Sequence, residues 1–123
     1  LTKHFRGLRM WLPLRLHGIA PFRACLEEKL ALAKYFHGEV RKMGFETGAA
    51  PELSVVVFRY VPKTGDPDKY NKNLAEAIRK DGYVFVSTTQ LRGKFMLRLA
   101  CLSFRSHLYH IEYLLHQLKK LIS

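Results

Sequence analysis

The sequence predicts an α+β fold, in which helices pack on one face of an antiparallel sheet of three to four strands. Segments with apolar residues at helical spacing and segments with the composition of strands follow one another in the order α-α-β-β-α-β-β-α. The strands come in consecutive pairs, and the dipeptide Arg92-Gly93 within the second pair is a hairpin signal. Consecutive strands followed by helices are typical of an antiparallel sheet whose helices lie on one side.

Two helices are predicted at the start of the chain. The first covers residues 5–17, and Pro13 inside it is expected to kink it. Gly18 ends this helix, and Pro21 suits the first turn of the second helix, which runs to about Met43. The apolar stripe of the first helix consists of Phe5, Leu8, Trp11, Leu12 and Leu16, and that of the second of Phe22, Leu26, Leu30, Ala33, Phe36 and Val40.

The middle of the chain predicts two strands and a third helix. Residues 45–47 and 54–60 have the composition of strands. Asp66 is expected to cap a helix that begins at Pro67, runs through Lys80 and is closed by Gly82. Its inward side is predicted to carry Tyr70, Leu74, Ala77 and Ile78.

A hairpin and a final helix complete the predicted fold. The hairpin strands are expected at residues 83–91 and 94–102, and residues 103–106 lead into the helix. One side of this helix is predicted to carry Leu108, Ile111, Leu115, Leu118 and Ile122, with Lys119 and Lys120 in the last turn, where they suit the helix dipole.

The second hairpin strand contains the stretch KFMLRLACL, in which Arg98 lies in the middle of an apolar run. The run is too short to cross a membrane and has the length of a buried strand. A buried guanidinium needs a carboxylate or phosphate partner, because an uncompensated charge is costly to remove from water. Arg98 is therefore the main candidate functional residue.

Composition limits the classes of function. A chain of 123 residues has room for one domain, and 21 Lys+Arg against 10 Asp+Glu give a formal charge of +11. This charge would suit nucleic acid or an anionic membrane surface, but the basic residues are scattered and form no run of five. No secretory signal and no span of 18 apolar residues is present. The chain opens with Leu1 and not Met, which indicates a processed product or a fragment.

Two cysteines are present, Cys25 and Cys101. They lie far apart in apolar surroundings, which predicts buried free thiols of a cytoplasmic protein and not a disulfide framework.

Two stretches of the sequence resemble one enzyme family. FRGLRMWLPLRLHGIAPFRACLEEKLALAKYF resembles the segment that enters the small C-terminal domain of the group II pyridoxal-phosphate-dependent amino-acid decarboxylases, which include aromatic amino-acid, histidine and glutamate decarboxylases. LRGKFMLRLACLSFRSHLYHIEYLL is similar to the last hairpin and terminal helix of that family. With the element order between them, the resemblance covers nearly the whole chain and is closest to the aromatic-type branch.

The resemblance implies a part of a fold-type I enzyme, a cytoplasmic homodimer that decarboxylates an L-amino acid. Residues 1–18 would be an interdomain entry helix and residues 19–123 the small C-terminal domain, and the large domain that holds pyridoxal 5'-phosphate (PLP) would be absent. In that family the cofactor lysine follows a histidine in the large domain, but this chain contains no His-Lys dipeptide. Its lysines, among them Lys3, Lys29, Lys34 and Lys42, are predicted on solvent faces or in loops. The chain alone is therefore expected neither to bind PLP covalently nor to decarboxylate a substrate.

The resemblance also implies a role for Arg98. In the glutamate-decarboxylase branch an arginine at the matching place of the hairpin strand faces the active site and engages the substrate carboxylate. A guanidinium suits this role because its planar fork of donors binds a carboxylate with two hydrogen bonds. The alternative is a structural ion pair between Arg98 and an acidic residue of the large domain.

Other residues have functional and structural interpretations side by side. Arg6 and Arg9 would approach the cofactor phosphate or, more simply, carry interdomain or surface charge, and Trp11 would pack against the large domain. His107 and His110 have the i, i+3 spacing of metal ligands but no third ligand nearby in the sequence, so no metal site is predicted.

Two other functions remain open from the sequence. One is a small basic domain that binds RNA or another polyanion, with Tyr83, Phe85 and Phe95 as a stacking platform, although no RNP-type motif is present and core packing is favoured for these rings. The other is a degenerate, regulatory remnant of the decarboxylase fold. The main hypothesis involves neither nucleic acid nor a membrane, and it leaves the amino-acid substrate open.

Overall fold

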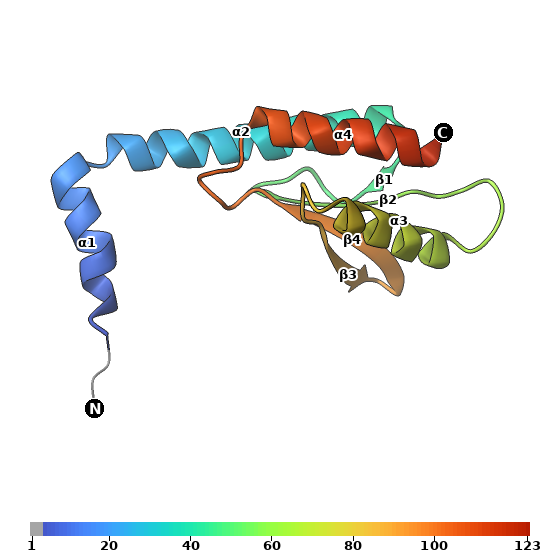
Figure 1. Ribbon diagram of the computed structural model, residues 1–123, viewed down its shortest axis with the longest axis horizontal. Coiled ribbons are helices and arrows are strands. Elements are labelled where there is room, and N and C mark those ends of the chain that lie inside the picture. Colours follow the sequence, from blue (N-terminus) through green and yellow to red (C-terminus); the bar gives the residue numbers. More distant parts are fainter. Residues whose placement is uncertain (1–3) are drawn as a thin grey trace.

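The computed structural model describes residues 4–123 and has the predicted order of elements (Figure 1). The elements are α1 (Arg6–His17), α2 (Ala20–Lys42), β1 (Glu46–Thr47), β2 (Val55–Arg59), α3 (Pro67–Asp81), β3 (Ser87–Leu91), β4 (Lys94–Ala100) and α4 (Leu108–Ile122). The strands form one antiparallel sheet in the order β1-β2-β4-β3, so β4 is flanked by a strand on either side. The α+β prediction is confirmed.

The hairpin between β3 and β4 turns at the predicted dipeptide. Arg92 and Gly93 have φ angles of 52° and 75°, and two successive residues with positive φ form the tight turn that matches the twist of antiparallel strands. The first strand of the hairpin is shorter than predicted, because β3 begins at Ser87 and not at Tyr83. The ring of Tyr83 stacks instead on that of His110 in α4 and lies tilted at 54° against that of Tyr113.

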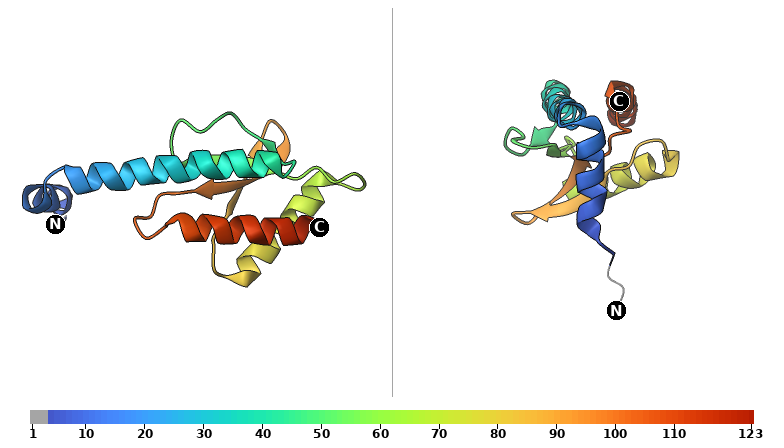
Figure 2. Two further views of the ribbon diagram at one scale, coloured as in Figure 1. Left: turned by 90° about the horizontal axis from the view of Figure 1, so that it is seen from above. Right: turned by 90° about the vertical axis from the view of Figure 1, so that its left-hand side faces the viewer.

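The helices α2, α3 and α4 cover one face of the sheet (Figure 2). Val56 and Phe58 of β2 and Leu97 and Leu99 of β4 point into this layer, because directly paired residues of neighbouring strands face the same side. They pack against buried side chains from the three helices, which are Leu32, Ala33, Phe36, Val40, Leu74, Ala75, Ile78, Ile111, Leu114 and Leu118. Burial of each large apolar side chain stabilises the fold by about 1.5–3 kcal/mol.

The caps of α3 lie where the sequence places them. Asp66 accepts a hydrogen bond from the backbone N–H of Asp68 at 2.9 Å, and Gly82 closes the helix in the left-handed conformation at φ 78°. Two buried residues of this helix, Asn71 and Ala75, lie outside the predicted inward side. Asn71 is completely buried, and its amide bonds the backbone N–H and carbonyl of Tyr60 and the carbonyl of Pro67.

The first helix and the start of the second form an arm that extends from the body (Figure 1). No residue of α1 is buried, and Trp11 is 58% exposed. The predicted apolar stripe of α2 is correct only for its later half, since Phe36 and Val40 are buried but Leu26 is 65% exposed. The early half of the stripe has no sheet or helix of the body to pack against.

The final helix α4 runs beside α2 (Figure 1). The prediction that Leu108 faces inward is wrong, because it is 47% exposed, whereas Leu114, which the predicted stripe omitted, is buried. Leu115 and Ile122 are only partly buried. Among the described residues, no helix combines the length and the apolar character needed to cross a membrane.

Candidate functional site

Arg98 lies on the face of the sheet that no helix covers. Its backbone pairs with Val57 of β2 and with Ser87 of β3, and all three side chains point to that face. The apolar run predicted a buried strand, but in the described chain the side chain of Arg98 is exposed. The apolar run alternates: Leu97 and Leu99 enter the core, and Arg98 between them points away from it.

The backbone of Arg98 is held on both sides. Its carbonyl accepts a hydrogen bond from the Ser87 hydroxyl at 3.2 Å, in addition to the pairing of β4 with β2 and β3. Within residues 4–123, no carboxylate lies within ion-pair distance of the Arg98 guanidinium. The guanidinium of Arg98, on a strand that is paired on both sides, can therefore bind an anion from outside the described chain.

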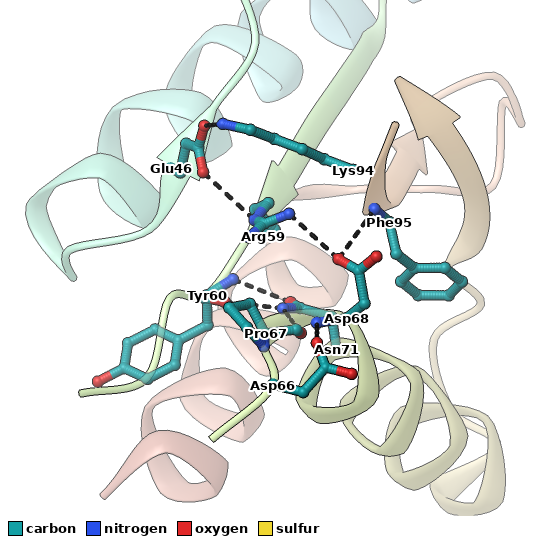
Figure 3. Close-up of polar contacts among 9 residues, drawn as sticks. All are labelled: Glu46, Arg59, Tyr60, Asp66, Pro67, Asp68, Asn71, Lys94 and Phe95. Carbon is teal, nitrogen blue, oxygen red and sulfur yellow. Dashed lines mark hydrogen bonds and ion pairs between the residues drawn. The ribbon is translucent and has the colours of Figure 1, made fainter. Parts of the chain in front are cut away.

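The buried arginine of the sheet is Arg59, at the end of β2 (Figure 3). It is 7% exposed, and its guanidinium lies between two carboxylates: Nε is 3.2 Å from Glu46 Oε2 and NH1 is 3.2 Å from Asp68 Oδ1. Arg59 was not among the residues predicted from the sequence. Like Arg98, it is a charged residue within an apolar strand, in the stretch VVVFRY, and this signal could have identified it.

Both carboxylates also bind the first residues of β4 (Figure 3). Glu46 Oε1 accepts from Lys94 Nζ at 2.5 Å, and Asp68 Oδ1 accepts from the Phe95 backbone N–H at 3.2 Å. We call Glu46, Arg59, Asp68 and Lys94 the arginine clamp. Its contact between Arg59 Nε and Glu46 is an ion pair without hydrogen-bond geometry, since the Nε–H has no acceptor in line.

A hollow of about 450 Å³ lies beside the arginine clamp. It is lined by Glu46, Thr47, Gly48, Ala49, Leu91, Arg92, Lys94 and Met96. Gly48 at its edge has a steric role, because a Cβ atom there would lie 2.5 Å from Val57 Cγ2. Glycine thus allows the chain after β1 to approach β2 closely.

Lys29 is buried, which contradicts its predicted place on a solvent face. It is 3% exposed, and its Nζ donates to the Ser106 carbonyl and to Glu28 Oε2. Glu28 Oε1 in turn lies 2.8 Å from His107 Nδ1. Hydrogen bonds from Lys29 and then from His107 hold the pKa of Glu28 below its ordinary value of 4.5.

The lysines singled out in the sequence have different environments in the structure. Lys29 is committed to the carbonyl and carboxylate that join α2 to the start of α4, and Lys94 to Glu46 in the arginine clamp. Lys34 and Lys42 are exposed on α2, and Lys3 lies outside the described residues.

The two candidate metal ligands have other roles. His110 Nδ1 accepts a hydrogen bond from the backbone N–H of His107 at 3.1 Å, which caps the start of α4. The described residues contain no group of three metal-ligating side chains.

The two cysteines are not bridged to each other. Cys101 is buried, and burial raises the pKa of its thiol, whereas Cys25 is only half-buried.

The aromatic residues of the hairpin region do not share one environment. The prediction that these rings pack in the core is wrong for Phe85, which is 72% exposed, and for Tyr83, which lies against α4 at the surface. Phe95 is half-buried with Lys72 Nζ 5.6 Å from its ring centre.

The candidate residues of the first helix lie away from the sheet. Arg6, Arg9 and Trp11 are all on the arm, which extends from the body (Figure 1).

Known proteins are similar to this chain over most of its length. It is 38% identical over 104 residues to tyrosine decarboxylase 2 of Arabidopsis thaliana, covering 81% of this chain and 19% of the relative. It is 31% identical over 111 residues to an aromatic-L-amino-acid decarboxylase of Bacillus atrophaeus, covering 86% of this chain and 23% of the relative. No protein-family model matches the chain.

A solved structure confirms the fold. The Oryza sativa TDC, crystallised with PLP and tryptamine, superimposes on this chain with a TM-score of 0.87 and 29% identity. The match covers 98% of this chain and 27% of the solved one. The chain thus spans about a fifth to a quarter of the length of the proteins that it matches.

Proposed function

The chain belongs to the group II pyridoxal-phosphate-dependent amino-acid decarboxylases, and we propose that it forms the C-terminal part of a cytoplasmic, homodimeric enzyme of this family. In this proposal residues 1–18 are an entry helix between domains, residues 19–123 are the small domain, and a large domain holds PLP. The names of the similar proteins support an aromatic L-amino acid as substrate. They give no support to an RNA-binding or regulatory function.

Arg98 is the substrate-binding residue of this proposal. The observation that carries it is the position of Arg98 on β4, an inner strand of the sheet, exposed on the uncovered face and without a carboxylate partner among residues 4–123. The guanidinium would bind the substrate carboxylate through two parallel hydrogen bonds. Because both carboxylate oxygens are then held, the direction of the bond between the carboxylate and the α-carbon is held as well.

The cofactor would come from the large domain. Lys29 and Lys94 make contacts within the chain, Lys34 and Lys42 are exposed on α2, and the chain has no His-Lys dipeptide, so the chain alone is expected to release no CO₂ from an amino acid. Its contribution to the reaction is to bind and orient the carboxylate.

The test uses the complete protein that carries this chain. CO₂ release from L-tyrosine and L-tryptophan is measured with PLP for the parent, Arg98→Ala and Arg98→Lys. We expect Arg98→Ala to lose about 100-fold or more in kcat/KM, because a charge-assisted bidentate contact is lost, and Arg98→Lys to recover part of it. The control is Arg41→Ala, which removes an exposed arginine of α2. Equal kcat/KM for parent and Arg98→Ala would leave Arg98 as a structural ion-pair residue.

A further inference from the structure

We propose that Arg59 is a positioning residue for Arg98: through the arginine clamp it holds the start of the strand that presents Arg98. This inference rests on the proposed function, because it concerns the residue assigned there to the substrate carboxylate. Its structural basis is the arrangement in Figure 3.

The two carboxylates that hold Arg59 belong to different elements. Glu46 comes from β1 and Asp68 from the first turn of α3. Each carboxylate has a second contact with β4, Glu46 with the side chain of Lys94 and Asp68 with the backbone N–H of Phe95. Arg59 is the one group of the clamp that touches both carboxylates, so it fixes two independent attachments of β4 at once.

Arg59 and Arg98 occupy the same face of neighbouring strands. Val57 pairs with Arg98, and Arg59 follows Val57 by two residues, so its side chain points to the same side. Lys94 precedes Arg98 by four residues, which is about 13 Å along an extended strand. At the other end of β4, the Cys101 N–H donates to the Ser54 carbonyl at 2.8 Å. The strand that carries Arg98 is thus held by contacts at both ends, and Arg59 stabilises those at its first residues.

The charges of the arginine clamp are balanced within the clamp, which distinguishes Arg59 from a substrate-binding arginine. Two cationic side chains, Arg59 and Lys94, face two carboxylates, Glu46 and Asp68, and the four formal charges cancel. Arg59 is buried and already paired with both carboxylates, whereas the guanidinium of Arg98 has no such partner among residues 4–123. Arg59 therefore acts on the substrate only through the position of Arg98.

The first measurement is hydrogen exchange of the complete protein, resolved by mass spectrometry into segments. In Arg59→Met we expect exchange of the segment 94–97 to rise about tenfold or more, with little change in 111–118 of α4. Arg59→Lys keeps the positive charge but lacks the planar fork of donors, so an intermediate rise in exchange of this segment is expected. Glu46→Gln, a milder change at a partly exposed residue, should raise exchange in the same segment even if Arg59→Met does not fold. An equal rise in both segments, or none, would overturn the proposal.

The second measurement is kinetic. Arg59→Met should raise KM for the amino acid about tenfold with a smaller loss in kcat, because carboxylate binding is weakened before chemistry is. The matched control is Leu118→Ala, which destabilises α4 in the core and should leave KM unchanged at an equal loss of thermal stability. The same KM change in both variants would contradict positioning. If Arg98→Ala leaves catalysis intact, the proposed function fails, and hydrogen exchange still decides whether Arg59 anchors β4.

Discussion

Arg59 and Arg98 point to the same face of two neighbouring strands but lie in opposite environments. Arg59, on β2, is buried between Glu46 and Asp68, and Arg98, on β4, is exposed without an acidic partner in the described chain. The first arrangement is typical of a structural charge, which is costly to bury unless it is paired. The second is typical of a group that binds an anion from outside.

Asn71 is expected to be one of the most sensitive polar residues. Its replacement by Ala removes the partners of the Tyr60 backbone N–H and carbonyl and of the Pro67 carbonyl. Buried backbone groups left without partners are costly, so Asn71→Ala should lower the free energy of unfolding by about 2–4 kcal/mol. Urea denaturation followed by circular dichroism measures this. Asn73→Ala, an exposed residue of the same helix, is the control, and a loss below 1 kcal/mol for Asn71→Ala would contradict the prediction.

Gly48 tests the close approach of two segments. Gly48→Ala should destabilise the fold by about 1–3 kcal/mol, because the new methyl group would meet Val57 Cγ2 at 2.5 Å. In a Val57→Ala background the same substitution should cost much less. A double-mutant cycle of unfolding free energies checks this, and strict additivity of the two substitutions would show that the clash does not occur.

The hydrogen bonds of Glu28 are expected to make the stability of the fold depend on pH. Its folded pKa is depressed by the hydrogen bonds from Lys29 and His107, so it contributes stability above its ordinary pKa of 4.5, and this contribution is lost as pH falls through the lower, folded value. Glu28→Gln should therefore unfold at a lower temperature than the parent at pH 6, and the difference should shrink below pH 4.5. Glu27→Gln, the exposed neighbour, is the control. A difference that stays constant across this range would refute the assignment.

The arm predicts self-association of the 123-residue chain. Leu8, Trp11 and Leu12 are all exposed on α1, and an apolar surface of this kind favours contact with another apolar surface. Sedimentation should show association that grows with concentration in the micromolar range, and Trp11→Gln combined with Leu8→Gln should weaken it. A monodisperse monomer over a wide concentration range would count against the prediction.

Local features of the fold could be predicted because their causes are local. The N-cap at Asp66, the left-handed Gly82 and the Arg92-Gly93 turn depend on the conformational preferences of a few adjacent residues. The candidate site was predicted in part. Arg98 was identified, but the clamp was not, because its members come from β1, β2, α3 and β4 and no pattern in the sequence links them.

By itself the sequence determined the order of the helices and strands, the turn and the caps, and it identified the family through two quoted stretches. The tertiary structure alone decided which charges are buried. Arg98 and Arg59 both lie in apolar strands and Lys29 on a helix with an apolar stripe, yet two of these residues are buried and one is exposed. The physical reason is that burial depends on what packs against a side chain, and those contacts join segments far apart in the chain.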